Sequence, residues 1–331
     1  LRTNTTEIKR FLPAKLKLPP EIDKLGNLYF TGRFSGFPKH FVAEGTLNTN
    51  IGQIQSDVKM DIGRILSYSG RVAVKEFDLG AWLNKPDKFG KATFSANVTG
   101  KGVKLDELQA NIDGNIASFT FNNYTYSNVA VNGNIDRRLF AGVVQVTDNN
   151  MQLSFKGSVD LNSETPKYNF VADVFKLRLK KLNLFKAENL SDDFELSGRT
   201  NLNLIGKDID DLFGNAAFYD VKVNNGKRIF ALDTVTLVST LHNNRRTLQL
   251  NSHILTANVN GSFTFKELPN AFINLLHNYF PYRFKYTKTT SPQIADFTIN
   301  INNPALLSQI FIPELESLAN TSIKGSFNSQ T

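Results

Sequence analysis

The chain has 331 residues, of which 41% are hydrophobic and 21% are charged, and its formal net charge at pH 7 is +8. This length fits two ordinary domains or one elongated domain, and the 27 phenylalanines concentrate the apolar content in large side chains, which argues against a disordered chain. The absence of cysteine excludes disulfide bonds, cysteine-ligated zinc and thiol nucleophiles.

Lysine and arginine are spread along the chain and form no block. A diffuse positive charge suits contact with an anionic membrane surface or an acidic partner, and it suits solubility equally well. No run of apolar residues approaches the roughly 18 needed to span a bilayer, and no secretory signal is present. The sequence starts at Leu1 and ends within an alternating pattern at 325–328, so we expect a segment of a longer protein with any anchor outside it.

Residues 1–25 are predicted to be a connector. Apolar residues are mixed irregularly with lysine and arginine, a short helix fits before Pro13, and Pro19-Pro20 closes the stretch. The same composition would suit a basic amphipathic contact with a membrane, and this alternative stays open.

Strand-like alternation begins at Gly26 and continues through most of the chain. In a strand, successive side chains point to opposite faces, so alternating apolar and polar residues predict one dry face and one wet face. The pattern predicts strands at residues 28–34, 41–47, 52–60, 71–77, 91–99, 112–121, 124–135, 144–147, 151–161, 168–180, 195–205, 216–223, 229–241, 245–255 and 259–265.

One predicted hairpin shows the pattern most clearly. Every odd position from Met151 to Leu161 is apolar or glycine, and every even position is polar. Val144 and Val146 alternate with polar residues just upstream, and the residues 148–150 between the two runs suit a tight turn. These residues predict a β-hairpin with one apolar side.

The apolar positions change parity within two neighbouring predicted strands. The change falls between Tyr126 and Val129 in one strand and between Ile116 and Phe119 in the other. One extra residue near Ser127-Asn128 would produce it, as a β-bulge does. Because bulges increase twist, we expect a coiled sheet.

Three short helical segments interrupt the strands. Residues 79–83 suit a helical turn. Apolar residues at i, i+3, i+4 and i+7 predict a helix over about 268–280, and an asparagine N-cap followed by proline predicts another over about 304–318. Both longer helices are expected to pack on the end or lip of a sheet.

An internal repeat relates the two halves. Residues 102–108 resemble residues 206–212, at an offset of 206 − 102 = 104. Repeats of strand-rich units favour an elongated structure in which each unit mainly contacts its neighbours. We therefore predict a first β repeat region over 26–175 and a second over 176–331.

No catalytic or metal-binding motif is evident. The four histidines share no ligand spacing, and the acidic pairs at 106–107, 192–193 and 210–211 lie in polar, turn-like settings typical of solvated surface. Residues 100–102 fail both the dinucleotide and the P-loop patterns, and no motif points to nucleic acid. We expect a protein that is not an enzyme, uses no metal or cofactor and binds no nucleic acid.

Glycines and phenylalanines are paired from Gly26 to Thr49 and lead to a Leu-x-Thr sequence. A leucine-rich turn, a glycine-initiated strand and a Leu-x-x-Leu motif follow one another at 79–108 and again at 177–212. Together with Asn123–Tyr126 and Asn303–Leu307, these features resemble the AsmA-like superfamily over nearly the whole chain. Within it, they are most similar to the middle segment of TamB-like translocation and assembly module proteins of the Bacteroidetes type.

The resemblance implies an elongated antiparallel sheet curled into an open trough, a β-taco, with a hydrophobic interior. It implies a periplasmic segment of a protein that is anchored in the bacterial inner membrane and meets membranes at both ends. The implied roles are phospholipid transport and the translocation and assembly of outer-membrane or secreted proteins, alongside an outer-membrane barrel partner. The family implies no catalytic residues.

The alternating apolar residues are predicted to point into one groove that receives phospholipid acyl chains or an unfolded β-strand. The candidate lining residues are Phe94, Val98, Phe119, Phe121, Val129, Val131, Val144, Val146, Leu153, Phe155, Leu202, Leu204, Val221, Val223, Leu248 and Leu250. Alternation alone does not separate a lined groove from a filled core. Two alternatives therefore stay open: a β-sandwich binding or adhesin module of the cell surface, and a β-helix enzyme acting on polysaccharide, which would need opposed carboxylates.

Overall fold

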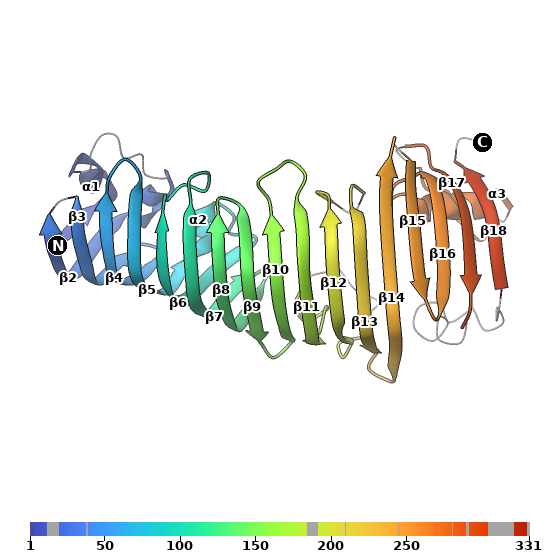
Figure 1. The fold of residues 1–331 in the computed structure, drawn as a ribbon, viewed down its shortest axis with the longest axis horizontal. Coiled ribbons are helices and arrows are strands. Elements are labelled where there is room, and N and C mark those ends of the chain that lie inside the picture. Colours follow the sequence, from blue (N-terminus) through green and yellow to red (C-terminus); the bar gives the residue numbers. More distant parts are fainter. Residues whose placement is uncertain are drawn as a thin grey trace. The chain divides into compact units, whose positions relative to one another are not determined.

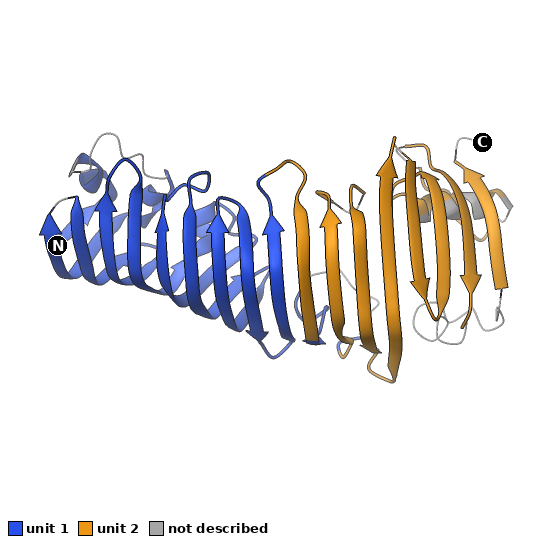
Figure 2. Ribbon diagram, in the orientation of Figure 1, with its two compact units in different colours: residues 1–162, 175–192 blue, residues 163–174, 193–331 orange. Residues whose placement is uncertain are grey.

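The structure is a computed structural model that describes residues 1–11, 20–37, 39–183, 191–208, 210–243, 245–279, 281–288, 291–303 and 321–329. The chain is all-β, with antiparallel strands in a curled sheet that does not close into a barrel (Figure 1), which confirms the predicted fold class. Two compact units divide it (Figure 2): unit 1 is residues 1–162 and 175–192, and unit 2 is residues 163–174 and 193–331. The predicted boundary at residue 175 differs, because residues 175–192 belong to unit 1.

Unit 1 is a meander in which each strand from β2 to β10 pairs with the next strand along the chain. The strands are β1 Arg2–Asn4, β2 Asn27–Phe37, β3 His40–Thr49, β4 Gly52–Ile62, β5 Leu66–Asp78, β6 Phe89–Lys101, β7 Gln109–Phe121, β8 Tyr124–Asp136, β9 Leu139–Thr147 and β10 Met151–Asp160. Helices α1, Thr5–Phe11, and α2, Leu79–Leu83, and the 3-10 helix η1, Pro20–Leu25, join them.

The first 25 residues do more than connect. β1 pairs with the start of β2, with Arg2 opposite Tyr29, and the amino group of Leu1 donates to the Phe30 carbonyl oxygen at 2.8 Å. These residues therefore extend the sheet. The part of the predicted connector at 12–19 lies outside the described residues.

The predicted helical turn at 79–83 is confirmed as α2. It begins because the Asp78 carboxylate accepts a hydrogen bond from the Ala81 backbone N–H at 2.8 Å, as an N-cap does. It ends at Asn84, whose left-handed backbone (φ 55°) closes the C-terminus. The Trp82 ring packs 5.6 Å from the Phe77 ring, so this only tryptophan contributes to packing.

One face of unit 1 carries an unbroken row of apolar side chains across nine paired strands. We call it the apolar row, and it consists of Phe30, Leu47, Ile54, Val74, Phe94, Ile116, Val129, Val146 and Leu153. Eight strand spacings of about 4.8 Å make the row on the order of 38 Å long. Alternation therefore produces a continuous apolar face, and the opposite face is polar.

Parallel to the apolar row runs a second row on the same face that is rich in small residues. Its central part pairs Val58 with Gly70, and its last three members are Gly133, Gly142 and Gly157 on neighbouring strands. Small residues let the strands approach closely where the sheet curls. A Cβ on Gly70 would lie 2.1 Å from the Asp57 carbonyl oxygen, and Gly70 has φ +144°.

Replacing Gly70 with alanine is therefore expected to destabilise the fold by about 2–4 kcal/mol, because it adds both a backbone clash and a strained φ. Urea unfolding measures the change. Gly63→Ala is the matched control, since a Cβ there would meet no atom closer than 3.7 Å. Equal stability of the two variants would contradict the close approach at Gly70.

The predicted bulges are present, but their arrangement differs from the prediction. The register of β6 against β7 shifts between Thr93 and Phe94, so β7 is bulged against β6. In contrast, β7 and β8 stay in register through the parity change, since Ile116 lies opposite Val129 and Phe119 opposite Tyr126. The apolar positions of β7 and β8 therefore change parity at paired residues, and neither strand has an extra residue relative to the other.

Unit 2 is a second antiparallel meander. Its strands are β12 Glu195–Ile205, β13 Phe213–Asn224, β14 Ile229–His242, β15 Arg245–Ser252, β16 Leu255–Ser262, β17 Ile294–Ile301 and β18 Thr321–Asn328, with helix α3 Leu268–Tyr279. β11, Lys167–Leu177, begins in unit 2 and ends in unit 1. The helix predicted at 268–280 is confirmed as α3, and the one predicted at 304–318 lies outside the described residues.

The sequence pattern misplaced one turn and missed three strands, namely β1, β17 and β18. Leu255 starts β16 and does not end the preceding strand, because Ser252 Oγ accepts hydrogen bonds from the backbone N–H groups of Ile254 and Leu255 and makes the turn there. β17 was not predicted from the sequence.

The internal repeat is visible in the strand boundaries. β6 ends at Lys101 and β12 at Ile205, and β7 begins at Gln109 and β13 at Phe213, so both pairs keep the offset of 104. The same order of strand, seven-residue turn and strand thus occurs in each unit.

Candidate functional site

The apolar face of unit 1 brings together all ten candidate groove residues of that unit. Phe94, Val129, Val146 and Leu153 belong to the apolar row. Val131, Val144 and Phe155 lie opposite one another in the adjacent row, and Val98 lies opposite Ile112 farther along the same face. Phe119 and Phe121 occupy the other end of the face, beyond the bulge.

Within the described residues most of this face is half-buried, and at its aromatic end the hydroxyl of the buried Tyr126 donates to the carbonyl oxygen of Leu182, which is fully buried. Among the ten residues only Val146 is buried, at 7% exposure, and the other nine are half-buried. A β-sandwich would bury such residues between two sheets. The apolar face of unit 1 therefore remains accessible to an apolar ligand.

An aromatic cluster forms the end of this face next to α2. It comprises Phe89, Phe119, Phe121, Tyr124 and Tyr126, with neighbouring ring centroids 4.8–6.4 Å apart. Sequence reasoning identified two of its members. It missed Phe89 because the register shift between Phe89 and Ala92 is not visible in alternation, and it missed Tyr124 and Tyr126 although the parity change before Val129 is visible there.

A buried carboxylate holds the turn beside the aromatic cluster. Asp148 is 3% exposed and accepts hydrogen bonds from Ser127 N–H at 3.0 Å, Ser127 Oγ at 2.8 Å and Asn150 N–H at 2.8 Å. The Tyr124 hydroxyl donates to the same carboxylate. The predicted turn residue Asp148 thus joins the β9–β10 turn to β8 at the level of the bulge.

Burial and hydrogen bonding shift the pKa values of this group in opposite directions. Burial, followed by the hydrogen bond to Asp148, raises the pKa of Tyr124 to about 12. Burial alone would raise the pKa of Asp148, but the hydrogen bonds from Tyr124, Asn150 and Ser127 outweigh it and lower that pKa. At neutral pH the pair is a neutral phenol and a carboxylate anion.

Tyr124 is accordingly expected to remain protonated until about pH 12. The folded-state pKa of Tyr124 lies above the ordinary value of 10.0. The protonated phenol therefore contributes its full stabilisation below about pH 10, and this contribution is lost as the pH rises toward 12. The difference between ultraviolet titrations of the wild type and Tyr124→Phe isolates this group. A midpoint near the ordinary value would contradict the hydrogen bond.

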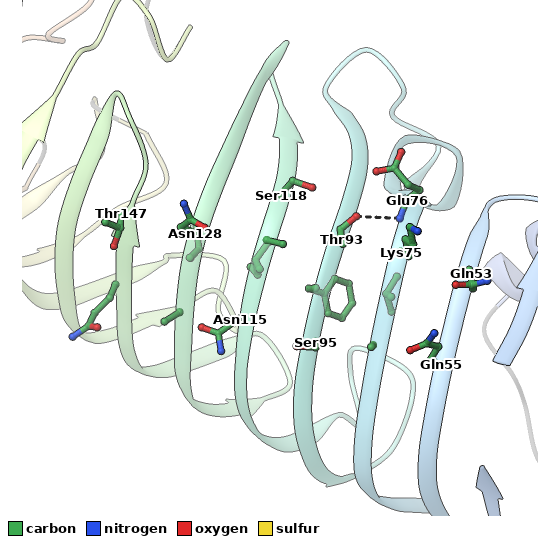
Figure 3. Close-up of a pocket in the computed structure, with 18 residues that line it drawn as sticks. Gln53, Gln55, Lys75, Glu76, Thr93, Ser95, Asn115, Ser118, Asn128 and Thr147 are labelled. Atoms are coloured by element: carbon green, nitrogen blue, oxygen red, sulfur yellow. Dashed lines mark hydrogen bonds between the residues drawn. The ribbon is translucent and has the colours of Figure 1, made fainter. Parts of the chain in front are cut away.

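A polar groove of about 860 Å³ lies on unit 1 (Figure 3). Its walls carry a cross-strand row of small and polar residues, namely Gln55, Ala73, Ser95, Asn115, Ala130 and Gln145, together with the apolar residues that alternate with them along the strands. At the bulge, the Glu76 N–H donates to Thr93 Oγ1 at 3.1 Å. Sequence reasoning missed this groove, because alternation reads a polar face as plain solvated surface.

In unit 2 the candidate groove residues fall into two groups. Leu202 and Leu204 line an apolar pocket of about 260 Å³ with Tyr168, Phe170 and Leu212, and Leu250 continues their face. Val221 and Val223 instead pack in a filled cluster around Phe230, Leu232, Ile254 and Ile301, and Leu248 packs in a second cluster next to α3. Val223 is buried at 5% exposure, whereas Val221 and Leu248 are half-buried and pack against these clusters.

A buried arginine was also missed. Arg246 is 2% exposed, and its guanidinium donates to the Leu212 carbonyl oxygen at 2.8 Å and to Ser239 Oγ at 3.1 Å while lying 4.6 Å from the Phe265 ring centroid. Burial lowers the pKa of this guanidinium. The Leu212 and Asp210 carbonyl oxygens and the Phe265 ring stabilise this buried cation, although its Nε has no hydrogen-bond partner.

The described residues contain no group of three or more histidine or acidic side chains placed to hold a metal ion. Within the same ranges, no helix is both long and apolar enough to cross a membrane. No family model, curated protein or solved structure matches this chain.

Proposed function

We propose that the chain is a non-enzymatic segment whose apolar face in unit 1 receives the acyl chains of phospholipids and conducts them along the protein. The observation that carries this proposal is the apolar row across nine strands, in which seven side chains are half-buried and two, Val74 and Val146, are buried. A continuous row lets a chain slide from one strand to the next without meeting a polar barrier.

The energetics of lipid transfer support this role. Exposing a methylene group to water costs about 0.8 kcal/mol, so a sixteen-carbon chain costs on the order of 12 kcal/mol in water. A row on the order of 38 Å long offers apolar surface over more than the length of such a chain. The face needs no catalytic group for this task.

The resemblance to TamB-like proteins extends the proposal. The protein would act between the inner and outer membranes, as the periplasmic part of a chain anchored in the inner membrane, and would work with an outer-membrane barrel partner. In that setting the same trough would serve outer-membrane biogenesis and protein secretion.

A second candidate cargo is an unfolded β-strand of a protein under assembly. The edge strand β2 favours it, because Phe34 and Phe37 on β2 are 56% and 79% exposed and β1 pairs with only three β2 residues. An exposed edge with apolar side chains can pair with an incoming strand.

Mass spectrometry of lipid extracted from the purified segment tests the proposal. We expect a near-stoichiometric phospholipid signal. A lipid-free protein with the same fold, which also fails to take up phospholipid from vesicles, would contradict the lipid role and shift support to strand binding.

A further inference from the structure

The polar groove of unit 1 opens on the face of the sheet opposite the apolar row. Gln53 and Gln55 of β4 line it (Figure 3), whereas Ile54, which lies between them and belongs to the apolar row, is absent from its described lining. The same arrangement recurs on β9 around Val146. Because successive side chains of a strand point to opposite faces, the groove and the apolar row occupy different sides of one sheet.

Large amide side chains and small side chains share one cross-strand row of the groove. The row, with one residue on each strand from β4 to β9, is Gln55, Ala73, Ser95, Asn115, Ala130 and Gln145. Five strand spacings of about 4.8 Å make it on the order of 24 Å long. The three amides therefore flank two stretches of the row that only small side chains occupy.

The three amides keep their hydrogen-bonding groups available. Gln55, Asn115 and Gln145 are exposed, and within the described residues their side chains form no hydrogen bond with another protein group. Elsewhere on unit 1 polar side chains do pair across strands, as the hydroxyls of Thr120 and Thr125 do at 2.9 Å. Each amide carries two N–H donors and a carbonyl acceptor, so the row offers both kinds of group to a ligand.

The groove carries little charge, in contrast to the polar surface next to it. Among the described residues that line it, Lys75 and Glu76 are the only charged ones, and Lys91 Nζ lies 3.2 Å from Glu76 Oε2. The next row of the same face is charged, since Asp57 lies opposite Arg71. A ligand that fits the groove is therefore polar and uncharged.

A neutral glycan has the chemistry and the spacing that this row requires. Sugar hydroxyls both donate and accept hydrogen bonds, as the amides do, whereas a nucleic acid would need several basic residues. One sugar ring is about as long as the distance between neighbouring strands, so an extended chain lying across the strands presents successive rings to successive strands. The methyl groups of Ala73 and Ala130 offer small apolar contacts to the C–H faces of the rings.

We propose that the polar groove of unit 1 binds an extended, neutral glycan chain, which lies across β4 to β9 and is held by the amides of Gln55, Asn115 and Gln145. The inference goes beyond the proposed function, because the groove and the apolar row lie on opposite faces and use different side chains. One sheet then carries two sites, one for an apolar chain and one for a polyhydroxylated chain.

Saturation-transfer NMR with sugar chains of equal length tests the site. The neutral probes are chitohexaose and maltohexaose, and hexagalacturonate is the anionic comparison. We expect at least one neutral probe to bind with a dissociation constant of about 1 mM, as an exposed site built on hydrogen bonds allows. Asn115→Ala and Gln145→Ala should each weaken it by about five- to ten-fold, as the loss of one or two hydrogen bonds does.

Asn132→Ala is the matched control for Asn115→Ala. Asn132 is an exposed asparagine on the neighbouring strand β8, it lies opposite Asp113 on the same face, and it is absent from the described lining of the groove. The affinity of this variant for the neutral probe should equal that of the wild type.

Failure of both neutral probes to bind the wild type at about ten times the expected dissociation constant would overturn the inference. Equal affinity of the wild type, Asn115→Ala and Gln145→Ala would overturn it too, because the glycan would then lie elsewhere. Tighter binding of hexagalacturonate than of either neutral probe would overturn the assignment to a neutral ligand. These measurements do not involve the apolar row, so each of these results leaves the proposed lipid function standing.

Discussion

Replacing Leu153 with glutamate is expected to abolish co-purification of phospholipid, with a loss of at least about 10-fold, because an ionised carboxylate in the apolar row would have to be desolvated beside an acyl chain. Leu153 lies opposite Val146 at the end of the apolar row and is half-buried. The lipid-to-protein ratio is measured by mass spectrometry of extracted lipid.

The adjacent residue supplies the matched control. Ser154 lies on the same strand, opposite Gln145 on the polar face, and is also half-buried. Ser154→Glu adds the same charge to the other side of the sheet, so its lipid content should equal that of the wild type. Equal lipid loss in both variants would mean that charge or stability, and not the apolar row, controls binding.

A second substitution on the same face, tested together with measurements of folding, separates loss of lipid binding from unfolding. Phe155→Glu changes the neighbouring row, where Phe155 lies opposite Val144. Circular dichroism and thermal unfolding show whether each variant keeps the sheet. If folded Leu153→Glu and Phe155→Glu proteins both retain full lipid, the apolar face of unit 1 is not the lipid site.

Replacing Asp148 with alanine is expected to lower the free energy of unfolding by about 3 kcal/mol, because it leaves the Ser127 and Asn150 N–H groups and the Tyr124 hydroxyl without their buried acceptor. Asp148→Asn should cost less, since its carbonyl oxygen still accepts some of these hydrogen bonds. Urea unfolding at neutral pH measures both variants.

The pH dependence gives an independent check of Asp148. Its folded-state pKa lies below the ordinary 3.8, so the carboxylate stabilises the fold above that pH and the contribution is lost as the pH falls below it. The wild type should therefore lose stability on acidification more steeply than Asp148→Asn. Asp113→Asn is the control, because Asp113 is exposed on the polar face. Parallel pH profiles for the wild type and Asp148→Asn would contradict the depressed pKa.

In unit 2, some of the predicted groove residues pack against hydrophobic clusters. Alternation predicts that Val221, Val223 and Leu248 line a groove, yet they pack in filled clusters. Val221 and Leu248 are nevertheless half-buried, like most candidate residues of unit 1, and only Val223 is buried. The two units therefore differ in what packs beside these side chains and not in how far the side chains are exposed.

The sequence by itself determined the all-β fold, most strand positions, the turn at 148–150 and which side of each strand is apolar, because these follow from local alternation and turn chemistry. It also showed the offset of 104 that the strand boundaries keep. Strand pairing alone decided that nine apolar residues align into one row, since register is a relation between strands that no single strand contains.

Tertiary structure also decided which apolar faces stay open. The register shift between Phe89 and Ala92 brings Phe89 to the groove, and the shared parity change of β7 and β8 brings Tyr126 there. Phe263 and Leu268, which belong to residues 263–293 between β16 and β17, pack in one cluster with Leu248. Burial depends on what packs over a side chain, and that information lies in distant parts of the chain.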